Sequence, residues 1–414
     1  MATHTTTAFL YAIQPAYYDV ISEVSRGATQ KDQFWVWITT TADGGTKYGS
    51  VDVYRVGGTV ELRGIDGFEV LEYNDKMIRI ACNELGVKSI EFRNPTSTIT
   101  TKSTISGFDI SPSSNLYAVG SSSGTIALST QSPPQNGTGP TATSEELTRT
   151  LEGHFAYTTC VKFFPSGKVL LSCGGDMLIK LWNIADGECA RTFVGHKAAV
   201  VDLAMVGRGR NFLSASADRT VKLWECASGE CAHTFEHPTA ATAPTKVTVT
   251  TRQDGIVRAA ENALEFETED KMAVVGFDNG DVVLYGMSTK DVLAVVGAPA
   301  AEAGVVGLDL SEDGTELVVG RAHSVERWDL QGDLAGPAQR VETAGEVVGL
   351  AVIGDGVALA MREGGSMVVS REGAVEWVAA ASAVAESQAE GVAVRGHRGV
   401  FVAQRDGQLL RYRG

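Results

Sequence analysis

A repeat of 42 residues constrains the fold of this chain more than any other feature. One copy runs from Gly153 to Trp182 and ends in DMLIKLWN, and a second runs from Gly195 to Trp224 and ends in DRTVKLWE. In both copies the tryptophan follows a histidine by 28 residues, a serine by 10 and an aspartate by 6. Self-similarity at a fixed period of this length indicates a repeat architecture rather than one small compact domain.

The Gly-His start, the Trp end and the period of about 42 residues resemble the WD40 repeat, which forms a four-stranded blade of a β-propeller. Five weaker copies share its order of strand, turn, strand and polar hairpin; in the fourth copy, ALEFE at 263–267 is interpreted as the first strand. With the tryptophan position as anchor, the copies end at Ser129, Trp182, Trp224, Tyr285, Trp328, Ser370 and Tyr412. We therefore predict an all-β fold: a seven-bladed WD40 β-propeller.

The repeats leave the beginning of the chain unexplained. Residues 1–95 alternate apolar and polar side chains, as in FWVWITT and MIRIAC, which predicts a small β-rich N-terminal domain. Residues 96–414 are assigned to the propeller, with loop insertions near 130–147 and 236–260. Because the last anchor lies two residues from the end of the sequence, blade seven needs an outer strand from elsewhere, and we expect residues 88–104 to donate it.

Four residues in each complete copy are suited to a buried hydrogen-bond chain from indole through hydroxyl and imidazole to carboxylate. These structural tetrads are His154, Ser172, Asp176 and Trp182 in blade two, and His196, Ser214, Asp218 and Trp224 in blade three. We interpret them as structural and not catalytic. The other five copies lack most of the tetrad, so blades two and three are expected to be the best-ordered part of the ring.

Motifs of known catalytic or metal chemistry are missing from the sequence. It contains no H-E-x-x-H, no Walker loop, no G-x-G-x-x-G and no Cys/His cluster with metal-ligand spacing. The GSSSG stretch at 120–124 matches a nucleophile pattern but falls in a hairpin, where it is expected to be a turn. We expect no enzymatic activity, no cofactor and no metal.

The charge of the chain favours a basic protein partner. The formal net charge is −15, which disfavours nucleic acid and anionic membrane surfaces. There is no apolar run of about 18 residues and no leader-like N-terminus, so a cytoplasmic and nuclear protein is expected.

In a propeller, the connections from one blade's outer strand to the next blade's inner strand lie on one face around the central channel. Seven acidic residues of blades four to seven fall in or near these connections or in hairpins that reach the same face. They are the predicted partner-binding residues Glu261, Asp278, Glu302, Glu346, Glu363, Glu386 and Glu390. Either they are part of a solvated acidic surface, or they form an acidic rim that steers a basic partner.

Residues 153–235 resemble more than a general WD40 protein. FFPSG after the first strand, GHK, and the D-x-A-x-V-x-R-G-R-N run at 202–211 resemble the proteasomal ATPase-associated factor family, as does the closing RDGQLLRY. The resemblance implies a non-enzymatic assembly chaperone of the proteasome 19S regulatory particle. It also implies binding to the C-terminal small domain of one AAA ATPase subunit and delayed docking on the core particle. We expect a monomer in the absence of this partner.

A WD40 substrate receptor or scaffold of a ubiquitin ligase, or of another complex, is the alternative. Receptors for one cullin adaptor often carry an arginine three residues after the blade tryptophan. Ala185, Ala227 and Gln331 occupy those positions here, which argues against this alternative.

Overall fold

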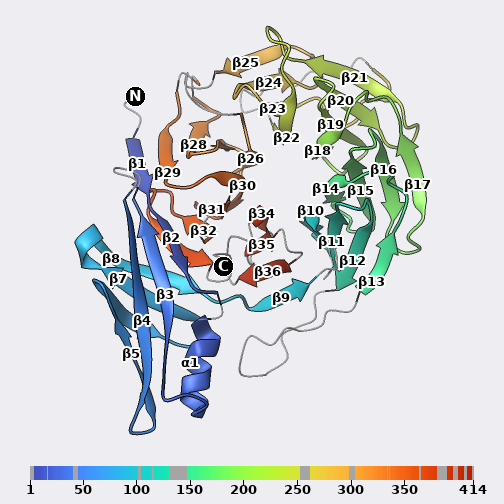
Figure 1. Ribbon diagram of the computed structural model, residues 1–414. Helices are drawn as coiled ribbons and strands as arrows, with labels where there is room; N and C mark the ends of the chain where they lie inside the picture. The colour runs from blue at the N-terminus through green and yellow to red at the C-terminus, as the bar shows by residue number, and fades with distance from the viewer. Residues whose placement is uncertain are drawn as a thin grey trace.

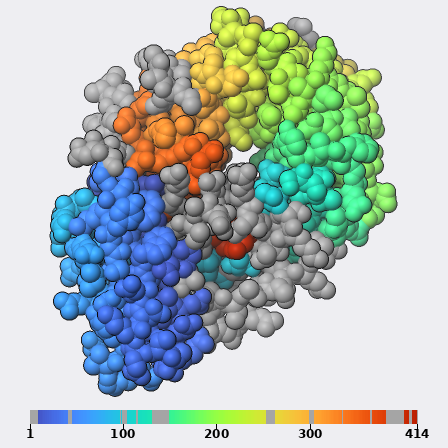
Figure 2. All heavy atoms as spheres, in the orientation of Figure 1, coloured from blue at the N-terminus to red at the C-terminus, as the bar shows by residue number. Residues whose placement is uncertain are grey.

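The computed structural model describes residues 4–15, 17–40, 45–100, 104–113, 116–130, 147–251, 262–297, 304–332, 334, 336–362, 365–379, 389–394, 400–404 and 408–412. Antiparallel four-stranded blades form a ring, with the N-terminal region attached to one side (Figure 1). A central opening is visible between blades on opposite sides of the ring (Figure 2). No helix in these ranges is long and apolar enough to cross a membrane.

The first four blades use consecutive strands. Blade one is β10 (Ile105–Ile110), β11 (Leu116–Ser121), β12 (Ile126–Thr130) and β13 (Leu147–Leu151). Blade two is β14 (Thr158–Phe163), β15 (Val169–Gly174), β16 (Ile179–Asn183) and β17 (Cys189–Phe193). Blade three is β18 (Val200–Val206), β19 (Asn211–Ser216), β20 (Thr220–Glu225) and β21 (Cys231–Glu236). Blade four is β22 (Pro244–Thr251), β23 (Lys271–Phe277), β24 (Val282–Gly286) and β25 (Val292–Val296).

The last three blades each recruit strands from the N-terminal region. Blade five is β26 (Gly307–Leu310), β27 (Glu316–Gly320), β28 (Ser324–Asp329) and β29 (Gln339–Thr343). Blade six is β30 (Val347–Ile353), β31 (Gly356–Met361), β32 (Met367–Val369) and β33 (Val375–Ala379). Blade seven is β34 (Ala389–Val394), β35 (Val400–Gln404), β36 (Gln408–Tyr412) and β9 (Ser97–Thr100).

Burial explains why the repeat has its hydrophobic pattern. The second strand of blade three, β19, is buried at every position because neighbouring blades pack on both of its faces. The outer strand β17 is largely exposed, and only Phe193 at its end is buried. The anchors predicted from the repeat fall in the third strand of their blades, except Ser370, which directly follows β32.

The inner strand predicted for blade four is wrong. Residues 263–267, the predicted strand ALEFE, form turns, and the inner strand is β22, with the β-branched sequence PTKVTVTT. β22 pairs in an antiparallel register with β23. The extra residues of this repeat therefore lie mainly between β22 and β23, at 252–270, which overlaps the predicted insertion near 236–260 only in part.

The described part of the N-terminal region contains one α-helix and a four-stranded sheet that is separate from the blades. Its elements are β1 (His4–Ala8), β2 (Leu10–Ile13), α1 (Tyr17–Arg26), β3 (Lys31–Thr39), β4 (Thr46–Val56), β5 (Thr59–Gly64), β6 (Phe68–Tyr73), β7 (Met77–Cys82), a 3-10 turn (Asn83–Leu85) and β8 (Val87–Arg93). Strands β2 to β5 form a four-stranded sheet, and α1 packs on β3 and β4. The helix was not predicted.

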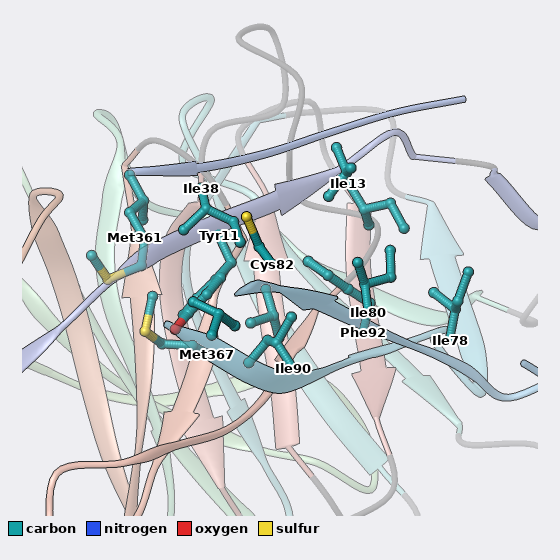
Figure 3. Packing of buried hydrophobic residues seen from close by; sticks show 14 of the residues in the cluster. Tyr11, Ile13, Ile38, Ile78, Ile80, Cys82, Ile90, Phe92, Met361 and Met367 are labelled. Atoms are coloured by element: carbon teal, nitrogen blue, oxygen red, sulfur yellow. The ribbon is translucent and has the colours of Figure 1, made fainter. Parts of the chain in front are cut away.

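Two parallel strand pairings join this region to the propeller. β1 extends blade five by pairing with β29, and β8 pairs with β33, so β6, β7 and β8 extend blade six to seven strands. One hydrophobic cluster spans both parts: Met361 and Met367 of blade six belong to it together with Tyr11, Cys82 and Ile90 (Figure 3). The predicted boundary at residue 95 falls between β8 and β9.

The ring closes through β9, which lies in the segment from which the sequence analysis expected a closing strand. β9 pairs antiparallel with β36 from Ser97 opposite Arg411 to Thr100 opposite Gln408. The Thr96 N–H also donates to the Arg411 carbonyl at 2.7 Å. The outer strand of the last blade therefore precedes all other propeller strands in the sequence.

Candidate functional site

One end of the propeller carries both tetrads, and we call it the loop face. It consists of the connections from each outer strand to the next inner strand and of the turns between second and third strands. In blades two and three these are residues 152–157, 175–178, 194–199 and 217–219. Antiparallel neighbours alternate in direction, so both kinds of connection lie at the same end of a blade.

The blade-two tetrad forms one continuous hydrogen-bond chain. The Trp182 indole N–H donates to Ser172 Oγ at 2.8 Å, and Ser172 Oγ lies 2.7 Å from His154 Nε2. His154 Nδ1 lies 2.8 Å from the nearer Asp176 carboxylate oxygen. Each group has a partner when the imidazole is neutral and carries its proton on Nδ1.

Blade three repeats this chain. Trp224 donates to Ser214 Oγ at 2.8 Å, and His196 lies 2.7 Å from Ser214 Oγ and 2.8 Å from Asp218. Gly195 has φ +156°, and a Cβ atom there would lie 3.1 Å from the Trp224 ring. The glycine before the histidine is therefore required by backbone conformation and by the close approach of the indole.

The tetrads have the connectivity of a Ser-His-Asp triad but cannot act as one. A nucleophilic serine must reach a substrate. Ser172 and Ser214 are 0% exposed, and each hydroxyl oxygen already accepts an indole N–H. The arrangement stabilises the connections of the loop face.

Burial gives the two histidines a pH-dependent effect on stability. Desolvation lowers the pKa of His154 and His196 despite the neighbouring aspartates, and Lys180 and Lys222 lower them further. The unfolded histidines take up protons near pH 6.5, whereas the folded ones stay neutral to lower pH. The contribution of the two neutral histidines to the free energy of unfolding is therefore fully present above pH 6.5 and decreases as the pH falls below this value.

We expect the free energy of unfolding to fall by on the order of 1 kcal/mol per tetrad histidine between pH 7.5 and pH 5.5. Urea unfolding at both pH values measures this change. The His154→Asn/His196→Asn variant should show a smaller difference between the two pH values. The pKa of Asp218 is lowered to about 2, so its own titration falls outside this window. If the free energy of unfolding changed equally with pH in the variant and in the wild type, the pH dependence would not come from these two histidines.

Blade five replaces the tetrad with a buried charged network that sequence reasoning missed. Glu326, 1% exposed, accepts from Arg321 Nε at 3.3 Å, from the Trp328 indole at 3.2 Å and from Arg340 Nη1 at 2.9 Å. Arg321, 0% exposed, also donates to the Gly280 carbonyl of blade four at 2.6 Å. Arg321 therefore ties two blades together at this face.

The predicted acidic rim is only partly within the described residues. Glu261, Glu302, Glu363 and Glu386 lie outside them, and Glu390 belongs to β34 without a described side chain. Asp278 is exposed, accepts from the Thr242 hydroxyl and accepts from Ala243 N at 3.3 Å. Glu346 is half-exposed and pairs with Arg362 at 2.9 Å. Whether these seven residues bind a partner stays a prediction.

Sequence reasoning also missed exposed apolar side chains on the loop face of blade two. Phe155, Tyr157 and Met177 are 88%, 48% and 42% exposed. They flank the tetrad residues His154 and Asp176 in the sequence, and that adjacency was the available signal. Among the described residues no group of His, Cys, Asp and Glu is arranged to hold a metal ion. Exposed apolar side chains gathered on one surface are typical of protein-binding surfaces.

The WD domain, G-beta repeat model matches residues 145–183 and 187–225. These ranges cover the outer strand of one blade followed by three strands of the next. The fold is a β-propeller that contains WD40 repeats.

The chain is similar to two curated proteins. Proteasomal ATPase-associated factor 1 of Homo sapiens is 34% identical over 146 residues, 34% of this chain and 34% of the relative. The Bos taurus protein of the same name is 33% identical over 144 residues, 33% of each chain. The match thus spans about a third of the length of these relatives.

Proposed function

We propose that this WD40 propeller is a non-enzymatic assembly chaperone of the proteasome 19S regulatory particle. It binds the C-terminal small domain of one proteasomal AAA ATPase subunit, in the cytoplasm or nucleus, and delays docking of the ATPase ring on the core particle. The observation that carries the proposal is a tetrad-stabilised loop face with exposed aromatic side chains. The name of the relatives, which associates them with a proteasomal ATPase, supports the choice of partner.

The purified full-length protein, used as bait against the isolated C-terminal domains of all six proteasomal ATPases, tests this proposal. Selective capture of one domain that weakens with added salt is expected, because steering by exposed charges is screened. Capture of none of the six would refute the ATPase assignment.

Charge reversal tests the acidic rim separately. The Glu302→Lys/Glu346→Lys/Glu386→Lys variant is expected to bind the captured domain about tenfold more weakly at low salt, mainly through a slower association rate. Glu312→Lys is the matched control, because Glu312 is an exposed acid in the β26–β27 hairpin at the opposite end of blade five. Surface plasmon resonance measures both rates. Unchanged association by the triple variant would exclude the rim while leaving the ATPase partner in place.

A further inference from the structure

Three apolar side chains, Phe155, Tyr157 and Met177, form what we call the aromatic sector of the loop face. Phe155, at 88% exposed, is the most exposed large apolar residue of the described chain. Large apolar side chains gathered on one surface mark binding sites in soluble proteins. An aromatic pair beside a methionine is the composition typical of an interface centre.

The aromatic sector is held in place before any partner binds. The Phe155 N–H donates to Asp176 Oδ2 at 3.1 Å, so the tetrad aspartate positions this residue's backbone. Gly175 N–H donates to the Tyr157 carbonyl at 2.9 Å, and a Cβ at Gly175 would lie 2.6 Å from the Tyr157 ring. Met177 sits in the left-handed region at φ 66°. A surface ordered in advance loses less entropy on binding.

The equivalent positions of blade three carry positive charge. Lys197 follows the tetrad histidine as Phe155 does in blade two, and Arg219 follows the tetrad aspartate as Met177 does. Both are exposed, and neither side chain forms an ion pair with another described residue. Lys197 N–H donates to Asp218 at 2.9 Å, so the same tetrad design positions this cation.

The exposed acids of the same loops are fewer than the exposed cations. Asp176 and Asp218 have side chains only 6% and 7% exposed and are bonded to their histidines. Glu152 is the one exposed acid within residues 152–157, 175–178, 194–199 and 217–219. In a chain of net charge −15, the exposed charged side chains of these segments are two cations, Lys197 and Arg219, and one acid, Glu152.

We propose that the loop face of blades two and three binds an acidic segment of a partner protein, with apolar side chains on the aromatic sector and carboxylates on Lys197 and Arg219. This inference deepens the proposed function and rests on it for the choice of face. It assigns this sector a ligand of opposite charge to the one expected for the acidic positions of blades four to seven. Two sectors of opposite charge would orient a partner as well as attract it.

Selection from a random 12-residue peptide display library on the full-length protein tests the inference without any ATPase domain. Enriched peptides are expected to combine aromatic or aliphatic residues with Asp or Glu. Their affinity, measured by fluorescence anisotropy, should fall at least tenfold in Lys197→Glu/Arg219→Glu. A similar loss is expected in Phe155→Ser/Met177→Asn, where asparagine suits the left-handed conformation.

Leu293→Thr/Val295→Thr is the matched control, because these side chains are 38% and 47% exposed on the outer strand β25. Thermal unfolding confirms that each variant is folded. A basic consensus, no enriched consensus, or peptides that bind the variants as well as wild type would overturn the inference. The ATPase assignment would survive each of these results if one ATPase domain is still captured.

Discussion

Replacing Glu326 with glutamine is expected to lower the free energy of unfolding by about 3–5 kcal/mol. The carboxylate is 1% exposed and is shared by Arg321 and Arg340, while the Arg321 side chain is itself 0% exposed. Glutamine keeps the shape but removes the negative charge that faces the Arg321 and Arg340 guanidinium groups. Removing one partner of a buried ion pair costs more free energy than the intact pair contributes to stability, because the remaining charge stays desolvated.

Urea unfolding of the purified variants measures this effect. Glu342→Gln is the matched control, because Glu342 faces the same Arg340 at 3.8 Å but its side chain is 50% exposed. The control is expected to change stability by less than about 0.5 kcal/mol. Arg321→Met/Glu326→Leu, which removes both buried charges, should lose less stability than Glu326→Gln. A loss in Glu326→Gln no larger than in the control would show that the network is not stabilising as argued.

The blade-five network shows where repeat reasoning stops. Glu326 lies two residues before its anchor tryptophan, the position of Lys180 and Lys222 in blades two and three. Those lysines donate to Thr192 and Thr234 on the outer strand, at 3.2 Å and 2.9 Å. In blade five both members of this cross-strand pair change, to Glu326 opposite Arg340. The change from lysine to glutamate at this repeat position could have predicted the Glu326–Arg340 pair. It carries no information about Arg321.

The tetrads and anchors were predictable because they depend on residue types at a fixed period. The N-terminal pairings were not, because a parallel pairing such as β8 with β33 joins segments far apart in the sequence. The helix α1 had a readable signal: Tyr17, Ile21 and Val24 are buried and recur at helical spacing. The strands that follow alternate apolar and polar residues, and because of this pattern the whole region was predicted to be β-structure.

The predicted partner-binding residues of the loop face were chosen by charge alone. Counting acids on connecting loops found Asp278 and Glu346, which the structure places on the loop face, one in a turn and one in a connection. Apolar residues in the same loops were not weighed, because a single Phe155 or Met177 in a repeat looks like core from the sequence alone. Exposure distinguishes a core residue from a binding residue, and exposure depends on the packing of neighbouring blades.

Removing residues 1–104 is expected to abolish cooperative unfolding of the propeller. This deletion takes away β9, whose pairing with β36 closes the ring, and β8, which covers the outer strand of blade six. Leu409, Leu410 and Tyr412 on β36 are at most 1% exposed in the closed ring, and an open last blade would leave its edge unpaired. Loss of the N-terminal half of the shared cluster exposes further apolar surface of blade six.

Two shorter deletions separate ring closure from the other contacts. Removing residues 1–8 deletes only β1, whose pairing with β29 extends an already complete blade, so a cooperative transition near the wild-type temperature is expected. Removing residues 1–93 keeps β9 but deletes the N-terminal side of the shared core, so the transition should persist at a clearly lower temperature. Differential scanning calorimetry ranks the three. If the 1–104 deletion unfolded as cooperatively as the 1–93 deletion, β9 would not be the strand on which the ring depends, because those two chains differ only by residues 94–104.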